Sequence, residues 1–216
     1  MLSIRQVLIA ILALMLFVPV TQADVGKPTV LVVGDSLSAG YGMSEQESWV
    51  ALLRDRLAAR GYGYDVVNAS LTGDTTGSGL QRLPRTLALH HPAIVIIELG
   101  GNDGLRGTPI KVVRSNLAAM IELCRDAGAE VILAGMQIPT NYGSSYTQAF
   151  TAVYPALATQ YRVELVDFFL ERVALDLKLI QADGIHPTAE AQPLLLDNVW
   201  PVLEKKLRKT PKTAAR

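Results

Sequence analysis

Five short stretches rich in valine, isoleucine and leucine recur along the chain, separated by longer segments of mixed polarity. Runs of this length, bounded by glycine, proline or polar residues, are typical of strands that are buried on both faces. The pattern predicts strands over residues 29–33, 65–69, 93–99, 130–135 and 163–167.

The segments between these strands have the apolar spacing of amphipathic helices. The residues that mark the helical faces are Trp49, Leu52, Leu53 and Leu57; Leu80, Leu83 and Leu87; Ile110, Val113, Leu117, Met120, Ile121 and Cys124; Ala149, Val153, Leu157 and Tyr161; and Leu194, Leu195, Val199, Val202 and Leu203. Alternation of strand and helix implies right-handed crossovers and a parallel sheet covered on both faces. We therefore expect one three-layer α/β/α domain with a five-stranded parallel sheet.

Polar, glycine-containing segments stand at the ends of these elements. Residues 34–38 follow the first strand, 70–75 the second and 100–104 the third, while residues 183–187 precede the last helix. The carboxyl ends of parallel strands meet at one edge of the sheet, where α/β proteins bind their ligands. We expect the four segments to converge at that edge.

Ser36 is the candidate nucleophile, because Gly34-Asp35-Ser36-Leu37-Ser38 places its hydroxyl directly after a buried strand. A serine hydroxyl needs a base to become reactive. In Asp183-Gly184-Ile185-His186-Pro187, the carboxylate can hold Nδ1–H of the imidazole while Nε2 faces Ser36. The alternative is that Asp183 caps the following helix beside a surface histidine.

The other two histidines and the single cysteine are expected to be structural. His90 and His91 end a helical segment before Pro92, where imidazoles commonly cap carbonyl groups. Cys124 continues an apolar helical stripe, which predicts a core-facing residue rather than a nucleophile. A single cysteine also excludes an intramolecular disulfide.

Acyl transfer further requires hydrogen-bond donors for an oxyanion. Gly73 can expose its backbone N–H, Asn102 can offer its side-chain amide, and the N–H of Ser36 is a third candidate. Taken separately, Gly73 and Asn102 are more typical of ordinary turns than of an oxyanion hole.

Four blocks, Gly34-Asp35-Ser36-Leu37, Gly73, Gly100-Gly101-Asn102-Asp103 and Asp183-Gly184-Ile185-His186-Pro187, resemble in their order those of the GDSL or SGNH hydrolases. The resemblance extends from Thr29 to the last helix and implies a flavodoxin-like domain with ester- and thioester-hydrolysing activity and no cofactor. It implies Ser36 as nucleophile, His186 as general base and acid, and Asp183 as the residue that orients His186. The N–H groups of Ser36 and Gly73 and the side chain of Asn102 would form the oxyanion hole.

The same resemblance implies mobile segments over residues 104–109 and 136–142. Residues expected to contact an acyl substrate are Leu105, Arg106, Ile138, Pro139 and Ile185. For any one of them, the alternative is a surface loop with scattered apolar side chains.

Three other classes of protein are alternatives to a serine hydrolase. The segment 34–42 lacks a Lys-Ser or Lys-Thr pair after a glycine and the chain lacks Gly-x-Gly-x-x-Gly, which argues against a phosphate-binding loop. Gly-x-Ser-x-Gly, the usual lipase elbow, is also absent. A metal hydrolase would have to use Asp35, Asp74, Asp103 and Asp183, whose spacing matches no dedicated metal site, so none is predicted. A non-catalytic lipid- or sugar-binding module is the third class.

The two ends of the chain differ from its middle. Arg5, the apolar stretch 7–20 and Thr21-Gln22-Ala23 predict a signal peptide over residues 1–23, hence a periplasmic or secreted protein without a membrane span after processing. The hydrolase domain is expected over residues 24–207 and a basic, flexible tail over residues 208–216. Most of the basic excess lies after Glu204, which leaves the domain negatively charged and unsuited to nucleic acid. We expect a monomer acting on a small acyl ester or lipid.

Overall fold

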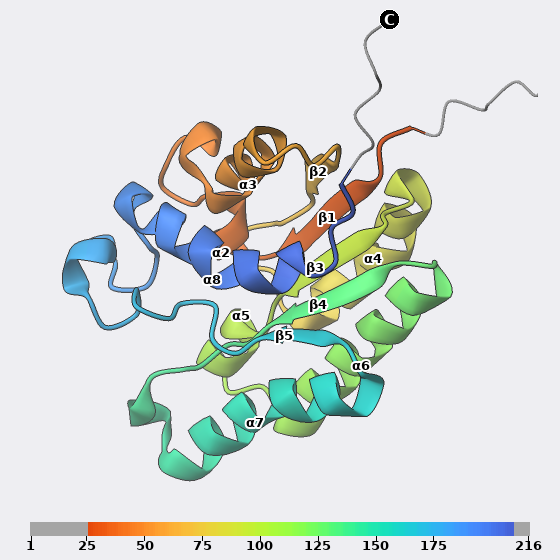
Figure 1. The fold of residues 1–216 in the computed structure, drawn as a ribbon. Helices are drawn as coiled ribbons and strands as arrows, with labels where there is room; N and C mark the ends of the chain where they lie inside the picture. Colours follow the sequence, from red (N-terminus) through yellow and green to blue (C-terminus); the bar gives the residue numbers. More distant parts are fainter. Residues whose placement is uncertain (1–25, 210–216) are drawn as a thin grey trace, which may run out of the picture.

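The computed structural model describes residues 26–209, which form a parallel five-stranded sheet (Figure 1). The strands are β1 (Thr29–Gly34), β2 (Asp65–Asn68), β3 (Ile94–Glu98), β4 (Glu130–Ala134) and β5 (Glu164–Val166). Their spatial order is β2-β1-β3-β4-β5, and every neighbouring pair is parallel. The predicted five-stranded sheet and the flavodoxin-like strand order are thereby confirmed.

Helices cover both faces of the sheet (Figure 1). On one face α3 (Trp49–Ala59) packs against α8 (Gln192–Glu204), and on the other α4 (Thr76–His90) packs against α6 (Ile110–Asp126), which in turn packs against α7 (Ser144–Tyr161). The shorter helices are α2 (Ser36–Ala39), α5 (Gly101–Leu105), η1 (Glu45–Glu47), η2 (Thr140–Tyr142), η3 (Leu177–Leu179) and η4 (Ala189–Ala191). The result is the three-layer α/β/α arrangement predicted from the alternation of strand and helix.

The direction of the strand order reverses beside β1. From β1 the chain moves outward to β2 on one side, then returns through α4 to β3 on the other side of β1. In such sheets the crevice between the two central carboxyl ends is where ligands bind. Ser36 follows β1 and Asn102 follows β3, so the topology alone places both residues at this crevice.

The sheet core is made of the apolar runs that predicted it. All residues of β3 and all of β1 except its first are buried, as is typical of parallel strands covered on both faces. Cys124 is buried on α6, which confirms that it faces the core, and burial raises the pKa of its thiol to about 12.

The predicted signal peptide lies outside the described residues, as does most of the predicted basic tail. Within residues 26–209, no helix is long and apolar enough to cross a bilayer.

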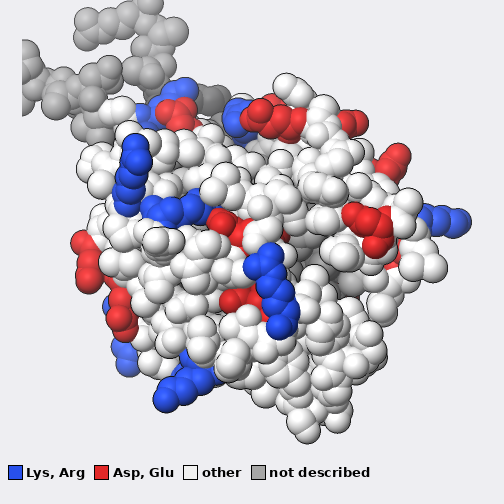
Figure 2. All heavy atoms as spheres, turned by 180° about the vertical axis from the view of Figure 1, so that it is seen from behind, with Lys and Arg blue, Asp and Glu red and all other residues white. Residues whose placement is uncertain are grey.

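Lys206, one of the basic residues after Glu204, is paired with two acidic side chains: its ammonium group lies 2.9 Å from Glu130 and 3.3 Å from Glu164. On the face shown in Figure 2, the acidic and basic side chains of the described residues are interspersed over a largely uncharged surface.

Candidate active site

The turn between β1 and α2 fixes the position of Ser36. Asp35 is the N-cap of α2, and its Oδ1 accepts the backbone N–H of Leu37 at 3.0 Å. Ser36 is the first residue of this short helix and is 8% exposed. A Cβ atom at Gly34 would lie 2.6 Å from Oε2 of Glu98, so only glycine lets the chain pass this close to the neighbouring strand.

His186 lies between Ser36 and Asp183. Its Nε2 is 2.9 Å from Oγ of Ser36, and its Nδ1 is 2.6 Å from Oδ2 of Asp183. The other carboxylate oxygen of Asp183 accepts the N–H groups of Ile185 and His186 at 2.9 and 3.0 Å. The hydrogen bond from the His186 side chain, followed by those two backbone donors, lowers the pKa of Asp183 to about 2.

Asp183 therefore closes the turn on which His186 stands and binds Nδ1 of the imidazole, and it does not cap the following helix. The residue before η4 is Thr188 and the one before α8 is Ala191, and neither element is capped by Asp183. The side chain of His186 is 16% exposed, so it is not an incidental surface histidine. The structure brings together the three residues that the sequence singled out.

Asn102 connects the loops that follow β1, β2 and β3. Its Nδ2 donates to Oδ2 of Asp35 at 3.0 Å and to the main-chain oxygen of Asp74 at 2.9 Å. Gly73, the residue before Asp74, has a positive φ of 82°, which glycine adopts without strain. The three candidate oxyanion donors thus belong to one hydrogen-bonded group of loops.

Two further contacts hold these loops in place. The guanidinium group of Arg82, on α4, binds Oδ2 of Asp74 through Nε at 2.7 Å and through a terminal nitrogen at 2.6 Å. Asp103 accepts the N–H and the hydroxyl of Thr76, each at 2.7 Å. The first contact ties the loop after β2 to α4, and the second ties the first residue of α4 to α5, which follows β3.

Hydrogen bonds and ion pairs also account for the four aspartates that a metal hydrolase would have to use as ligands. Each carboxylate is engaged by a different partner: Asn102 and the α2 N-terminus for Asp35, Arg82 for Asp74, Thr76 for Asp103 and His186 for Asp183. Within the described part of the chain, no three His, Cys, Asp or Glu side chains gather as a metal site would require.

A buried carboxyl group that the sequence reasoning missed contacts two residues near Ser36, namely Asp35 and Ser38. Glu98, at the end of β3, is fully buried; its Oε2 accepts the hydroxyl of Ser38 at 2.6 Å and the N–H of Asp35 at 3.4 Å. Oε1 has no hydrogen-bond partner among the described residues. Burial, reinforced by the charge of Asp35, holds the pKa of Glu98 well above its usual range. The one acidic residue inside the apolar run 93–99 was the sequence signal for it.

The residues expected to contact the substrate lie in three places. Arg106 is exposed and donates to the main-chain oxygen of Gly73 at 3.2 Å, and Ile185 is 51% exposed beside His186. Leu105 is half-buried at the end of α5, and its main-chain oxygen accepts a hydrogen bond from the Tyr142 hydroxyl at 3.1 Å. This hydrogen bond joins the two segments predicted to be mobile.

The remaining pair differ from each other in burial. Pro139 is exposed, whereas Ile138 is 8% exposed. Ile138 packs closely over Gly104, where a Cβ would lie 2.4 Å from its Cγ2. Most of the Ile138 side chain therefore contributes to the core rather than to a groove.

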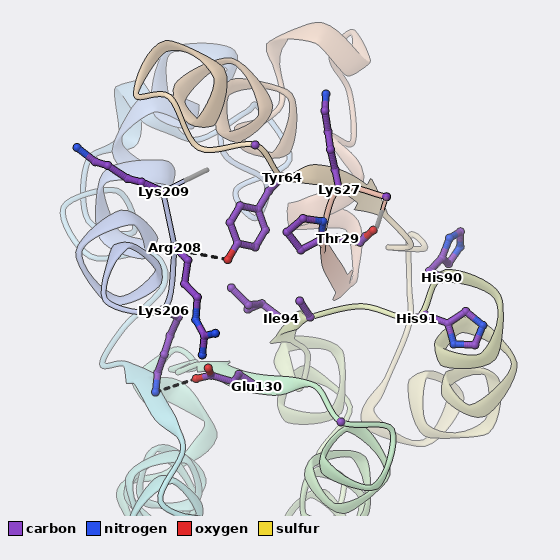
Figure 3. A pocket seen from close by; sticks show the side chains of 15 residues that line it. Lys27, Thr29, Tyr64, His90, His91, Ile94, Glu130, Lys206, Arg208 and Lys209 are labelled. Carbon is purple, nitrogen blue, oxygen red and sulfur yellow. Dashed lines mark hydrogen bonds and ion pairs between the residues drawn. The ribbon is translucent and has the colours of Figure 1, made fainter. Parts of the chain in front are cut away.

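His90 and His91 lie at the opposite end of the sheet. Figure 3 shows them beside a hollow whose lining includes Lys27 and Ile94, at the amino ends of β1 and β3. His90 is the last residue of α4 and His91 is its C-cap, with a left-handed φ of 41°. Both were expected to be structural residues at a helix end, and both are found there.

Comparison with known proteins gives the chain close relatives. It is 55% identical over 176 residues to Esterase TesA of Pseudomonas aeruginosa, which covers 82% of this chain and 88% of that protein. It is 46% identical over 169 residues to Thioesterase 1/protease 1/lysophospholipase L1 of Escherichia coli K12, which covers 78% and 80% respectively. The crystal structure of the psychrotrophic esterase EstA from Pseudoalteromonas sp., inhibited by monoethylphosphonate, superimposes with a TM-score of 0.79 at 38% identity, covering 83% of this chain and 98% of that one.

The model of the GDSL-like Lipase/Acylhydrolase family matches residues 32–193, a range that includes Ser36, Gly73, Asn102, Asp183 and His186. The match confirms the resemblance drawn from the four sequence blocks. The chain belongs to the GDSL-like lipase/acylhydrolase family.

Proposed function

We propose that this protein is a serine-dependent carboxylic ester hydrolase that cleaves esters and thioesters of acyl chains. The observation that carries the proposal is that His186 contacts Ser36 on one side and Asp183 on the other, with Oγ–Nε2 and Nδ1–Oδ2 distances of 2.9 and 2.6 Å. These distances are those of a nucleophile hydrogen-bonded to its base and a base oriented by a third group.

The first half of the reaction acylates Ser36. Asp183 holds the proton on Nδ1 of His186, so Nε2 is free to accept the Ser36 proton while Oγ attacks the carbonyl carbon. The carbonyl oxygen becomes an oxyanion. His186 then donates its new proton to the leaving alcohol or thiol as the carbon–oxygen or carbon–sulfur bond breaks.

The oxyanion would be held by the N–H groups of Ser36 and Gly73 and by Nδ2 of Asn102. Such donors stabilise the transition state because they are already oriented when the negative charge develops. The Asn102 amide already donates to Asp35 and Asp74, so it would share one of these hydrogens with the oxyanion.

The second half releases the acid. Water takes the place of the leaving group and attacks the acyl carbon while His186 removes its proton. His186 then returns this proton to Oγ of Ser36 as the second tetrahedral intermediate collapses to the carboxylic acid. Every step uses protein groups and water, so the mechanism requires no cofactor.

Acyl esters and lipids are the proposed substrates because the relatives are named an esterase and a thioesterase/lysophospholipase. Leu105, Arg106, Pro139 and Ile185, with the exposed part of Ile138, would contact the acyl chain or the leaving group. Movement of segments 104–109 and 136–142 would adjust this surface.

We further propose that residues 1–23 direct the chain across the inner membrane of a bacterium and are then removed. The basic n-region, the apolar stretch and the small residues before Asp24 support this location. Expression of the full chain followed by fractionation and N-terminal sequencing tests the proposal: a periplasmic protein that begins at residue 24 supports it, and an uncleaved protein contradicts it.

The protein is also proposed to be a monomer, and size-exclusion chromatography with light scattering tests this oligomeric state.

Replacement of Ser36 tests the enzymatic role. Ser36→Ala should lower hydrolysis of a short-chain p-nitrophenyl ester by at least about a thousandfold, while Ser115→Ala, on the exposed side of α6, keeps the parental rate. A serine-directed phosphonate should label the parent at Ser36, which mass spectrometry identifies. A chelator should leave the rate unchanged. An active Ser36→Ala variant would favour a binding module or a metal enzyme instead.

A further inference from the structure

The aromatic ring of Tyr41 lies against the imidazole of His186. The two ring centroids are 4.2 Å apart, and the ring planes are inclined by 34°. Tyr41 is 46% exposed, whereas the His186 side chain is 16% exposed. The tyrosine ring therefore shields the imidazole from solvent on one side.

The backbone of Tyr41 is attached to the nucleophile helix. Its N–H donates to the main-chain oxygen of Ser36 at 3.1 Å, past Gly40, which ends α2 in the left-handed conformation. The tyrosine ring and the Ser36 hydroxyl thus belong to the same short turn of chain. A displacement of this turn would move both groups relative to His186.

Gln181 links that turn to the turn of His186. Its Nε2 donates to the main-chain oxygen of Tyr41 at 2.8 Å and to that of Pro187 at 2.9 Å. Its own N–H donates to the main-chain oxygen of His186 at 2.7 Å. The ring contact and these three hydrogen bonds join the two segments that must approach each other for Ser36 to meet its base.

We propose that Tyr41 is a positioning residue for His186: its ring keeps the imidazole within reach of the Ser36 hydroxyl and stabilises the imidazolium formed during acyl transfer. The inference rests on the proposed function, in which His186 gains and loses a proton. The face of an aromatic ring attracts a cation within about 6 Å of its centroid. The 4.2 Å separation meets this condition.

The charged groups that act on His186 come from two elements. Asp183 lies on its own turn, and Asp35 lies on the turn before α2. Asp183 contacts the ring in the hydrogen bond at Nδ1. Tyr41 supplies an aromatic contact to the same ring, 4.2 Å between centroids.

Three variants separate the possible roles of Tyr41. Tyr41→Phe keeps the ring and should retain the parental kcat and pH profile. Tyr41→Ala removes the contact and should lower kcat about tenfold to a hundredfold for a short-chain ester, with KM unchanged within about twofold. Tyr41→Leu fills much of the space without an aromatic face, so the acidic limb of its kcat/KM profile should move about 0.5 pH unit downward.

Two controls identify a general or a structural effect. Tyr161→Leu removes a tyrosine ring from the far end of α7 and should leave kcat and the pH profile parental. Thermal unfolding of each variant shows whether it is folded, and the half-exposed position of Tyr41 predicts little loss of stability.

NMR measures the ring contact directly. The ring current of Tyr41 should displace the His186 ring-proton signals of the parent, and this displacement should vanish in Tyr41→Leu.

The outcomes distinguish failure of the inference from failure of the proposed function. Parental kcat in Tyr41→Ala, an unmoved acidic limb in Tyr41→Leu, a loss in Tyr41→Phe equal to that in Tyr41→Ala, or a change in KM alone would each overturn the positioning role. An active Ser36→Ala variant would overturn the proposed function, whereas the NMR measurement reports the ring contact without reference to turnover.

Discussion

The side-chain amide of Asn102 donates a 3.0 Å hydrogen bond to the carboxylate of Asp35, a group that is 2% exposed. The other oxygen of Asp35 accepts the N–H of Leu37 at the start of α2. One carboxylate thus binds both the start of the Ser36 helix and a proposed oxyanion donor. Burial is the main cause that raises the pKa of Asp35 to about 6.

Asp35→Asn should lower kcat about tenfold to a hundredfold, less than the full loss of an oxyanion donor. Leu37 and Asn102 donate to different oxygens of Asp35, and asparagine replaces one of these oxygens with an NH2 group, so one of the two donors would face another donor. The measurement is kcat and KM for a short-chain ester, with Asp65→Asn, at the exposed amino end of β2, as the matched control. An unchanged kcat would show that Asn102 is oriented without Asp35.

Glu98→Gln should stabilise the protein more at pH 8 than at pH 4. The pKa of Glu98 is raised in the folded state, chiefly by burial, so its protonated form is favoured by folding and stability falls as pH rises above about 4.5. Glutamine keeps the shape and can still accept the hydroxyl of Ser38, but it has no proton to lose.

Denaturant unfolding of parent and variant across this pH range measures the difference. The exposed Glu45→Gln change is the control and should show no such trend. A difference in unfolding free energy that is independent of pH would mean that the Glu98 carboxyl titrates alike in the folded and unfolded states.

The sheet was predictable from sequence because its strands are continuous apolar runs, and burial on both faces leaves them no other arrangement. Ser36, Gly73 and Asn102 were predictable because each follows a strand, and Asp183 and His186 because their turn directly precedes the last helices. Tyr41 and Gln181 were not, since their importance comes from contacts across 140 residues that no local pattern encodes. Segments 34–38 and 100–104 were expected as loops because their glycine and polar residues favour turns, but the structure forms α2 and α5 there, and the side chain of Asp35 caps α2.

Arg82→Met should destabilise the fold by about 3 kcal/mol, because it leaves the largely buried carboxylate of Asp74 without its cation. The Asp74 and Arg82 side chains are 10% and 22% exposed, and their contact distance is 2.6 Å. Arg82 also donates to the main-chain oxygen of Ala69, so kcat should fall as the loop that holds Gly73 loses its anchor.

The double variant Arg82→Met with Asp74→Asn checks this explanation. It removes the uncompensated charge and should regain part of the lost stability, because the remaining cost is that of hydrogen bonds alone. Urea unfolding of the single and double variants gives the coupling energy. Strictly additive losses would contradict a direct interaction between the two side chains.

Asp183→Asn should lower kcat about a thousandfold or more while the fold persists. The variant can no longer hold the proton on Nδ1 of His186, so Nε2 carries it and cannot accept the Ser36 proton.

The same Asp183→Asn variant should also differ from the parent in how its stability depends on pH. The pKa of Asp183 is lowered to about 2 in the folded state, so its contribution is complete above the unfolded value near 4 and is lost as pH falls from about 4 to 2. Parent and variant should therefore differ in Tm at pH 7 and converge at about pH 1, below both pKa values. A Tm difference that persists at about pH 1 would assign the stabilising contact to a group other than the Asp183 carboxylate.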